Sequence, residues 1–534
     1  MTSMPWFHKT TIYQIYPRSF YDSNTDGIGD LQGILQKLDY VQRLGFETLW
    51  ISPFFASPQA DFGYDISDYT SIAPEYGTME DAIQLIEQVH RRGMKIVFDM
   101  VLNHTSIEHA WFKKSSSSRE GPWVDWYIWR DRPNNWLSVP GGSGWHYAKE
   151  RGQYFWASFL PFQPDLNYRN PQVKQAMLNN VRFWLEKGVD GFRLDIFNYI
   201  YKDEEFHDNP FSFRLLPSED DPSGFFQQAK YTVNLPESFE FAREFRNVCD
   251  EYGEKLSIGE VSGGTSTIRK FLGENGNNGL TLVFDFGMLN FKFTADYFRD
   301  LIRNMEMQYP EPFMPVYAFS NHDRRRSMSR LGGDVRKARL LHMFQLTVRG
   351  VPCIYYGEEI GMTNAKFPFG TALDPIPHKY KFIPRFVFDA LGLTINRDEV
   401  RTPMQWNGER YAGFSSDDQT WLPVHENYER INVESEEQDG NSLLNTIRSL
   451  LRVRGKERAL QEGTLALLDG LPQNVLGFIR SIEREKIFIL LNFDDQVQEF
   501  PAQGTEVLFN LTKASQLNGK NVRLDAYGAL ILKQ

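Results

Sequence analysis

The sequence predicts an α/β protein: a closed (β/α)8 TIM barrel, with an irregular subdomain inserted after its third strand and an antiparallel β-sandwich at its C-terminal end. Three observations predict this fold. Short apolar, β-rich runs alternate with helical patterns, one connection between runs is far longer than a helix requires, and the last part of the chain changes to strand-and-turn sequence.

Eight apolar runs form the predicted barrel. They span 11–16, 48–53, 95–104, 191–197, 256–261, 280–286, 316–323 and 351–359. Their hydrophobicity is nearly continuous, as strands buried on both faces require. Helical patterns lie between many of them, and those at 79–93 and 173–188 close on basic residues and glycine, as helices usually do. This alternation is typical of parallel β/α units, and eight units close a barrel.

The connection between the third and fourth runs, residues 104–167, is the predicted insertion. It holds seven of the twelve tryptophans, which are Trp111, Trp123, Trp126, Trp129, Trp136, Trp145 and Trp156. We expect these rings to hold a loop-rich unit together; the alternative is that they stack on sugars.

The predicted domain boundaries follow from these changes of pattern. After a helical pattern at 442–454 the sequence turns to strands and turns, for example at 474–495. The chain therefore predicts a barrel in 1–103 and 168–455, the inserted subdomain in 104–167 and the C-terminal β domain in 456–534.

Bulk properties exclude several classes of function. The 534 residues carry 58 Lys and Arg against 69 Asp and Glu, a formal net charge of −11, which disfavours a nucleic-acid partner. Cys249 and Cys353 show no pairing pattern, residues 1–20 lack the pattern of a signal peptide, and no apolar stretch reaches the length of a membrane span. We expect a cytoplasmic monomer or homodimer with no membrane partner and no organic cofactor.

Polar residues gather where the predicted strands end. They are Asp99, Asn103, His104, Arg193, Asp195, Glu260, Asn321, His322 and Asp323. Singly, each has an ordinary structural reading as a helix cap or hydrogen-bonding group. Together they would meet at the C-terminal face of the barrel, where such folds carry their active sites. Carboxylates that are packed together repel one another and destabilise the folded protein, so such a set is expected where the groups have a function. The set therefore predicts an active site.

The stretch DGFRLDIFN (190–198) suggests the chemistry. Arg193 and Asp195 lie two residues apart in a strand and therefore point to the same face. A pair of carboxyl groups near a common centre is typical of glycoside hydrolysis, in which one attacks the anomeric carbon and the other protonates the leaving oxygen. Asp195 would be the ionised group, its pKa kept low by Arg193, and Glu260 would carry the proton.

Seven motifs then match a known family. They are DMVLNH (99–104), GFRLD (191–195), IGEV (258–261), SNHD (320–323), QPDLN (163–167), DFGYDISDY (61–69) and RTPMQW (401–406). In their order and spacing the chain resembles the α-amylase superfamily of retaining α-glycosidases, and within it the exo-acting α-glucosidase and oligo-1,6-glucosidase branch. The resemblance spans nearly the whole chain and implies a small oligosaccharide as substrate.

The resemblance implies roles for ten residues. Asp195 would be the nucleophile, Glu260 the general acid/base and Asp323 the carboxylate that stabilises the transition state. The substrate-binding residues would be His104, Arg193 and His322 around the glucose, Asp61 and Arg401 gripping its non-reducing end, Tyr64 stacking under the ring, and Phe159 at a family aromatic position. A pocket closed at this end implies removal of single glucose units.

A loop near the N-terminus resembles a metal site. In YDSNTDGIGDLQGI (21–34) the oxygen ligands would be Asp22, Asn24, Asp26, the Ile28 carbonyl and Asp30, around a glycine turn. Gly33 stands where a calcium loop carries its bidentate glutamate. From the residues alone a solvated Asp/Asn turn is nearly as good a reading. The resemblance implies a structural Ca²⁺.

Several positions depart from the family pattern. Ile196 follows the predicted nucleophile where Val accompanies α-1,6 linkages and Ala or Thr accompanies α-1,4, so its shape favours α-1,6 cleavage. Pro140 replaces a common pocket phenylalanine, and the sequence RRRSMSR (324–330) and the segments 203–236 and 366–400 also differ. These parts would contact the leaving group.

The alternatives to an α-1,6-preferring glucosidase therefore stay open. They are an α-1,4-preferring maltase, a transglucosidase or sugar isomerase of the same family, and a catalytically silent scaffold. The presence of all three carboxylates argues against the last.

Overall fold

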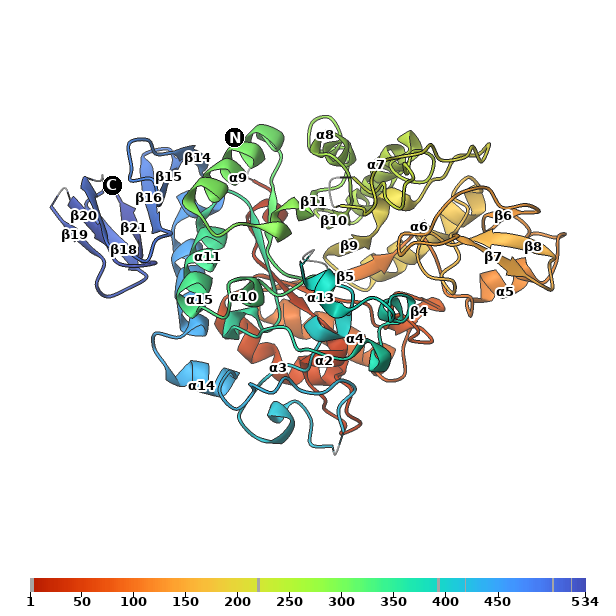
Figure 1. Ribbon diagram of the computed structural model, residues 1–534, viewed down its shortest axis with the longest axis horizontal. Coiled ribbons are helices and arrows are strands. Elements are labelled where there is room, and N and C mark those ends of the chain that lie inside the picture. Colours follow the sequence, from red (N-terminus) through yellow and green to blue (C-terminus); the bar gives the residue numbers. More distant parts are fainter. Residues whose placement is uncertain (1–3, 219–220, 391–393, 418, 502–503, 520) are drawn as a thin grey trace.

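The computed structural model describes residues 4–218, 221–390, 394–417, 419–501, 504–519 and 521–534. Its central sheet has eight parallel strands in the order β11-β10-β9-β5-β2-β1-β13-β12. The strands are β1 (Ile12–Ile15), β2 (Thr48–Ile51), β5 (Lys95–Val101), β9 (Gly191–Asp195), β10 (Leu256–Glu260), β11 (Leu282–Phe284), β12 (Val316–Ala318) and β13 (Val351–Tyr355). β11 and β12 contact each other and bring the sheet round into a nearly closed barrel (Figure 1). The predicted barrel is confirmed.

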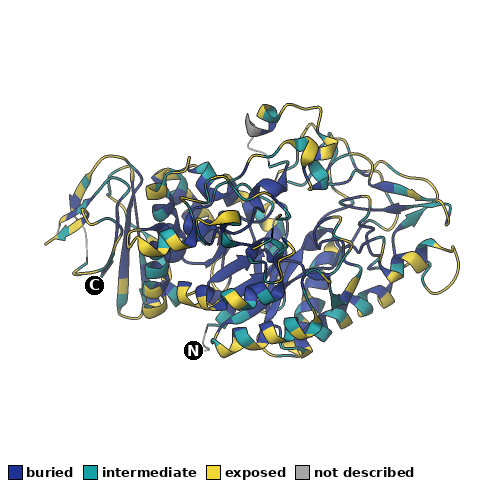
Figure 2. Cartoon of the chain, turned by 90° about the horizontal axis from the view of Figure 1, so that it is seen from below, coloured by how far each residue is buried: buried dark blue, intermediate teal, exposed yellow. Residues whose placement is uncertain are grey.

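Helices surround this barrel, each with a buried face toward the core and an exposed face toward solvent (Figure 2). The long ones are α3 (Leu31–Leu44), α4 (Met79–Arg91), α6 (Pro171–Glu186), α7 (Pro236–Asp250), α9 (Ala295–Gln308), α11 (Val335–Thr347) and α15 (Leu443–Lys456). In α4 the residues Ala82, Leu85, Ile86 and Val89 repeat at helical spacing and are buried. Thr78 and Asp81 form a capping box, which satisfies the free N–H groups at the start of this helix.

The strands are shorter than the apolar runs that predicted them. The run 316–323, for example, contributes only Val316–Ala318 to the sheet. The polar ends of these runs leave the sheet and form loops at the carboxyl end of the barrel. This geometry leaves their side chains available to line a cavity.

The insertion between β5 and α6 contains α5 (Ala110–Ser116) and a small antiparallel sheet of β6 (Trp129–Arg130), β7 (Trp145–Ala148) and β8 (Gln153–Trp156). Trp136, Trp145 and Trp156 pack together as a buried cluster. The ring of Trp126 contacts the rings of both Trp111 and Trp123. Among the described residues no tryptophan lines the main cavity. The rings thus hold the subdomain together and do not provide sugar-stacking surfaces in that cavity.

The C-terminal part is an antiparallel sandwich at the opposite end of the molecule from the insertion (Figure 1). One sheet contains β14 (Thr464–Leu467), β15 (Val475–Ile482), β16 (Glu485–Asn492), β18 (Glu506–Asn510) and β21 (Ala529–Lys533). The other contains β17 (Gln498–Pro501), β19 (Gln516–Asn518) and β20 (Asn521–Leu524). Side chains of both sheets, such as Leu490 and Val522, share one buried apolar cluster.

Shorter elements connect these parts. They are α1 (Trp6–Lys9), α2 (Pro17–Phe20), β3 (Phe55–Ala56), β4 (Asp68–Ile72), η1 (Phe197–Tyr199), α8 (Thr265–Ile268), η2 (Arg269–Leu272), η3 (Phe286–Asn290), α10 (Ser327–Arg330), η4 (Glu358–Ile360), η5 (Phe369–Thr371), α12 (Pro375–Lys379), α13 (Arg385–Ala390), η6 (Arg397–Val400), η7 (Arg410–Gly413), α14 (Val433–Gln438) and α16 (Arg458–Glu462). In the described part of the chain no helix has the length and apolarity to cross a membrane. Cys249 and Cys353 are buried free thiols.

Candidate active site

A cavity of about 630 Å³ opens at the carboxyl end of the barrel strands. Seven of the predicted catalytic and substrate-binding residues line it: Asp61, Tyr64, His104, Phe159, Asp195, Glu260 and Asp323. The other three, Arg193, His322 and Arg401, are fully buried behind its wall. Residues from distant parts of the chain therefore lie around one cavity. The sequence alone places each of them only within its own stretch of chain.

Arg193 lies at the centre of the carboxylate cluster. Its Nη1 donates to Asp99 Oδ1 at 2.8 Å and to Asp195 Oδ1 at 2.9 Å, and its Nη2 donates to Glu260. The guanidinium is completely buried and also faces the ring of Trp50. One positive charge thus orients three carboxylates, among them the predicted nucleophile and acid.

Because Arg193 is shared among three carboxylates, the pKa of Asp195 differs from the predicted one. Burial raises the pKa of its carboxyl well above the usual value, and the charges of Glu260 and Asp99 raise it further against the attraction of Arg193. The prediction that Arg193 keeps the pKa of Asp195 low is therefore wrong. The physical reason is that Arg193 is divided among three carboxylates and cannot neutralise all of them.

His322 connects Tyr64 with Asp323. The rings of Tyr64 and His322 stack with centroids 5.4 Å apart, and the Tyr64 hydroxyl lies 2.5 Å from His322 Nε2. The same nitrogen lies 3.1 Å from Asp323 Oδ2, while Gln14 Nε2 lies 2.7 Å from His322 Nδ1. This stack fixes one wall of the cavity and the orientation of Asp323.

Asp323 is the carboxylate of the cluster that is held ionised. Burial alone would raise its pKa, but His322, Arg401 and Arg397 together hold the pKa well below the usual aspartate range. Arg401 Nη2 donates to Asp323 Oδ1 at 2.6 Å, and Arg397 Nη1 lies 3.5 Å from the same oxygen. A permanently charged acceptor in this position suits binding of sugar hydroxyls.

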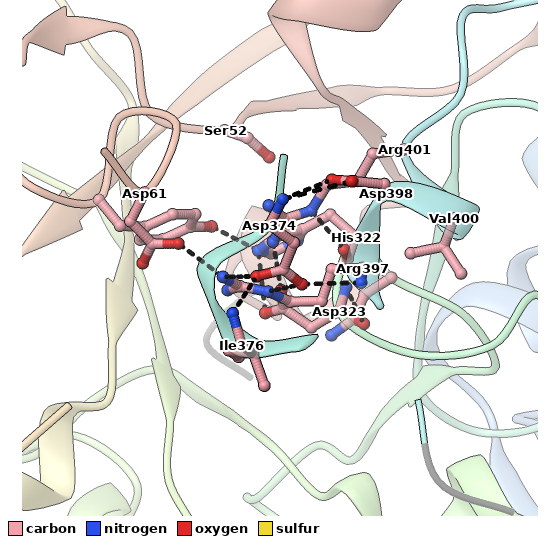
Figure 3. Close-up of polar contacts among 12 residues, drawn as sticks. Ser52, Asp61, His322, Asp323, Asp374, Ile376, Arg397, Asp398, Val400 and Arg401 are labelled. Atoms are coloured by element: carbon pink, nitrogen blue, oxygen red, sulfur yellow. Dashed lines mark hydrogen bonds and ion pairs between the residues drawn. The ribbon is translucent and has the colours of Figure 1, made fainter. Parts of the chain in front are cut away.

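Arg397, which the sequence reasoning missed, is the cation that pairs with Asp61 (Figure 3). Its Nη2 donates to Asp61 Oδ1 at 2.6 Å and to Asp374 Oδ1 at 2.9 Å, and its Nε donates to Asp374 Oδ2 at 3.0 Å. Arg397 lines the cavity, whereas Arg401 lies behind it, with Nε on the His322 carbonyl at 2.9 Å.

The role assigned to Arg401 is therefore divided in the structure. Arg401 supports Asp323, and Arg397 holds Asp61 at the cavity wall. The charged run NRDEVR (396–401) was a signal that could have drawn attention to Arg397.

The inserted subdomain provides a second wall. His104 is buried and its pKa is lowered by burial, so its neutral ring can donate from Nε2 to the Tyr64 carbonyl, 3.2 Å away. Phe159 packs on the apolar cluster of Ile196, Tyr199 and Val233. Ile196 has φ 33° and ψ 45°, a left-handed conformation that is strained for a β-branched residue. This strain at the residue after Asp195 marks the turn that leads the chain out of the strand.

The loop 22–30 has the oxygen donors that Ca²⁺ prefers. Asp22 accepts backbone N–H groups of Thr25 and Gly27, at 2.8 and 2.9 Å, and this draws the loop into a turn. Asp26 is exposed, while Asp30 caps α3 through the Gly33 N–H. No three His, Cys, Asp or Glu side chains in the described residues form a metal-binding group, so a metal here would depend also on the Asn24 amide and the Ile28 carbonyl.

The segments that the sequence singled out as unusual line part of the cavity. Segment 203–236 contributes Leu216, Pro217 and Phe225 to the lining, and segment 366–400 contributes Ile376 and Phe388. Residues 219–220 and 391–393 within these segments lie outside the described residues.

Comparisons with known proteins agree with this geometry. The profile of the alpha-amylase catalytic domain matches residues 14–463. A probable alpha-glucosidase of Rhizobium meliloti (strain 1021) is 39% identical, over 99% of this chain and 97% of its own length. An oligo-1,6-glucosidase of Parageobacillus thermoglucosidasius is 36% identical, over 93% of this chain and 92% of its own.

Solved structures give the same fold. The alpha-glucosyl transfer enzyme XgtA has a TM-score of 0.89 at 36% identity, covering 99% of this chain and 100% of that one. The trehalulose synthase MutB of Pseudomonas mesoacidophila MX-45 has a TM-score of 0.88 at 31% identity, with 99% and 100% covered.

Proposed function

Because this chain belongs to the alpha-amylase family and is a glycoside hydrolase, we propose that it is a retaining, exo-acting α-glucosidase that releases glucose from the non-reducing end of short α-glucosides. The observation that carries this proposal is the shared contact of Arg193 with Asp195 and Glu260 at one cavity. Asp195 attacks the anomeric carbon and forms a glucosyl-enzyme while Glu260 protonates the leaving oxygen. Glu260 then accepts a proton from the water that releases glucose.

The exo action that we propose rests on a group of buried charged residues at the cavity wall. Asp61, Arg397 and Asp374 form a buried, hydrogen-bonded group there, and Gln163 Nε2 donates to the second oxygen of Asp61 at 3.0 Å. A polysaccharide chain has no passage through such a group. Asp61, Arg397 and Asp323 are placed to bind the hydroxyls of a terminal glucose.

The linkage preference that we propose is α-1,6. It rests on the β-branched Ile196, which lines the cavity beside Val233. One methylene changes discrimination by only about 1–3 kcal/mol, so this preference is a matter of degree. Glucose release from isomaltose, maltose and nigerose measures it, and proton NMR of the first anomer formed tests retention. Faster release from maltose, or β-glucose as first product, contradicts the proposal.

The nucleophile is tested by Asp195→Asn with an aryl α-glucoside. Asp190 provides the matched control, because it precedes the same strand at the opposite end and pairs with Lys95 and His90. We expect Asp195→Asn to abolish turnover and Asp190→Asn to retain it. Full activity of Asp195→Asn would exclude the mechanism.

A transglucosidase or sugar isomerase is the second candidate, favoured by the names of the structural relatives XgtA and MutB. In such an enzyme a sugar hydroxyl intercepts the glucosyl-enzyme before water does. The ratio of glucose to new disaccharide, measured with sucrose and with isomaltose, separates the two candidates.

We also propose that loop 22–30 binds a structural Ca²⁺. The set of oxygen donors from Asp22, Asn24, Asp26, Ile28 and Asp30 supports it. The ion would stabilise the start of α3 and has no part in the reaction.

A further inference from the structure

Three arginines line one side of the main cavity. They are Arg324, Arg325 and Arg330, from the stretch RRRSMSR (324–330) that differs from the family pattern. The Arg330 guanidinium lies 4.7 Å from the ring centroid of Phe291, and the residue before that ring, Asn290, also lines the cavity. The stretch that follows β12 and the turn that follows β11 therefore build this side together.

The order of the barrel strands makes this the side of the leaving group. Asp61 and Arg397, which would bind the terminal glucose, come from the loops after β2 and β13, on either side of β1. In the ring of eight strands β10 and β11 lie opposite β1 and β2, and β12 contacts β11. Glu260, which would protonate the leaving oxygen, ends β10. A leaving group that extends past Glu260 therefore reaches the side where the arginines lie.

The carboxylates of the cavity have cationic partners of their own. Among the described lining residues the acidic ones are Asp61, Asp195, Glu260 and Asp323. The cations that pair with them include Arg193, Arg397 and Arg401, none of which belongs to the stretch RRRSMSR. Within the part of the chain that the structure describes, no hydrogen bond or ion pair engages the half-buried Arg325 guanidinium. Its charge is therefore available to a ligand.

Arg330 is a second cation close to Arg325. Burial lowers the pKa of Arg330 to about 10, and the like charge of Arg325 adds to this effect against the attraction of Glu358. Glu358 does not line the cavity; it accepts from the hydroxyls of Ser320 and Ser327, both at 2.6 Å. Arg330 Nε is buried and has no hydrogen-bond partner among the described residues. An anion on this side of the cavity would offset the repulsion between the two guanidinium groups.

The positive charge here is a local feature of an acidic chain. The formal net charge of the protein is −11, so composition does not account for three arginines on one side of a cavity. A cavity side with one sign of charge attracts ligands of the opposite sign. A sugar hydroxyl both donates and accepts hydrogen bonds, whereas a guanidinium only donates and matches the oxygens of a carboxylate or a phosphate. These arginines therefore suit an anion better than a neutral sugar.

We propose that the leaving-group side of the cavity binds an anionic group, so that α-glucosides whose leaving alcohol carries a carboxylate or a phosphate are cleaved in preference to neutral ones of the same size. This inference rests on the proposed α-glucosidase activity and specifies its substrate class. The reaction is unchanged: the bond between the anomeric carbon and the leaving oxygen breaks, Asp195 takes the glucosyl group, and the oxygen takes the proton of Glu260. Arg325 and its neighbours bind and orient the leaving group.

Three substrates with the same carbon skeleton test the proposal. They are the α-glucosides of glycerol, glycerate and glycerol 3-phosphate, each linked through the middle carbon of the three-carbon unit. At low ionic strength we expect kcat/KM for at least one anionic substrate to exceed that for the glycerol compound about ten- to hundredfold, and added salt to reduce this ratio. The better of the two anionic substrates identifies carboxylate or phosphate as the recognised group. A glycerol compound cleaved as fast as both anionic substrates, or faster, would overturn the proposal.

Arg325→Gln tests whether this arginine provides the preference. Arg484→Gln is the matched control, because Arg484 is exposed in the turn between β15 and β16 and does not line the cavity. We expect Arg325→Gln to lower the anionic-to-neutral ratio of kcat/KM about tenfold and Arg484→Gln to leave it unchanged. The ratio does not depend on the folded fraction of a preparation, so a partial folding defect does not affect it. An equal ratio in the wild type and in Arg325→Gln contradicts the assignment.

Binding separates failure of this inference from failure of the proposed function. Calorimetric titration of Asp195→Asn with the three α-glucosides measures the contribution of the anionic group without turnover. Tighter binding of an anionic compound than of the glycerol compound, with no hydrolysis of any α-glucoside by the wild type, would overturn the glucosidase activity but support the anion site. Hydrolysis by the wild type, with equal binding and equal kcat/KM for all three compounds, would do the reverse.

Discussion

Replacing Arg397 by methionine removes the one cation that pairs with Asp61 among the described residues, while the methionine keeps an apolar stem of similar length. Asp61 and Asp374 have side-chain exposures of 3% and 0%, so water cannot take over the role of the guanidinium. Removing one partner of a buried ion pair costs about 3–5 kcal/mol, because the remaining charge stays buried. We expect the free energy of unfolding of Arg397→Met to fall by about this amount at neutral pH.

The pH dependence of this loss has a defined sign. Burial raises the pKa of Asp374 while Arg397 lowers it, and the net direction in the wild-type protein is downward. Without Arg397 the burial effect remains, and the folded protein then favours protonated Asp374. The variant should therefore be closest to wild type in stability at acidic pH, and the deficit should grow as the pH rises through the aspartate range.

Urea unfolding at several pH values, with kcat/KM for an aryl α-glucoside, checks both expectations. We expect kcat/KM to fall about ten- to hundredfold, since Arg397 also lines the cavity and hydrogen bonds to charged groups are worth about 1.5–3 kcal/mol. Arg92→Met is the control, because its partner Asp39 is 68% exposed and such pairs contribute about 0–1 kcal/mol. A stability loss no larger than that of the control, independent of pH, would refute the reasoning.

Three further predictions concern other groups. Glu260→Gln should lower kcat about 10²–10⁴-fold for alkyl α-glucosides and much less for a 4-nitrophenyl α-glucoside, whose leaving group needs little protonation; equal losses would exclude the acid role. EDTA should lower the melting temperature of the wild-type protein, and Asp26→Ala should abolish this response; an unchanged wild-type melting temperature would remove the Ca²⁺ proposal. Burial raises the pKa of Glu359 from 4.5 to about 7. Between these pH values the free energy of unfolding of the wild type should therefore fall by about 2–3 kcal/mol as the pH rises, and that of Glu359→Gln should not. Parallel stability profiles of the two proteins would contradict this.

The sequence predicts the barrel well because its strands carry a local signal. A run such as KIVFDMV is apolar on both faces, and this requirement for a buried parallel strand is visible without any partner. The common face of Arg193 and Asp195 is equally local, since it follows from strand geometry.

The parts that sequence reasoning missed depend on contacts between distant residues. Asp61 and Arg397 are 336 positions apart, and nothing near either residue identifies the other. Arg397 and Arg401 stand four residues apart at the ends of one short helical turn capped by Asn396. Which of them enters the cavity is decided by this turn, and a motif that contains only Arg401 cannot show it.

The charges around Arg193 affect the ionisation of the aspartates at this site. Asp99, Asp195 and Glu260 place three acidic groups on one guanidinium, and burial raises the pKa of both Asp99 and Asp195 above the usual value. These two carboxyl groups therefore favour their protonated forms more than isolated aspartates do. In the reaction that we propose, a glucosyl ring beside Asp195 would develop positive charge at its anomeric carbon, which favours ionised Asp195, while its leaving oxygen would accept a proton from Glu260. On the proposed mechanism, the charge that develops in the substrate therefore opposes the effect of burial and restores the ionised form of Asp195 that attack on the anomeric carbon requires.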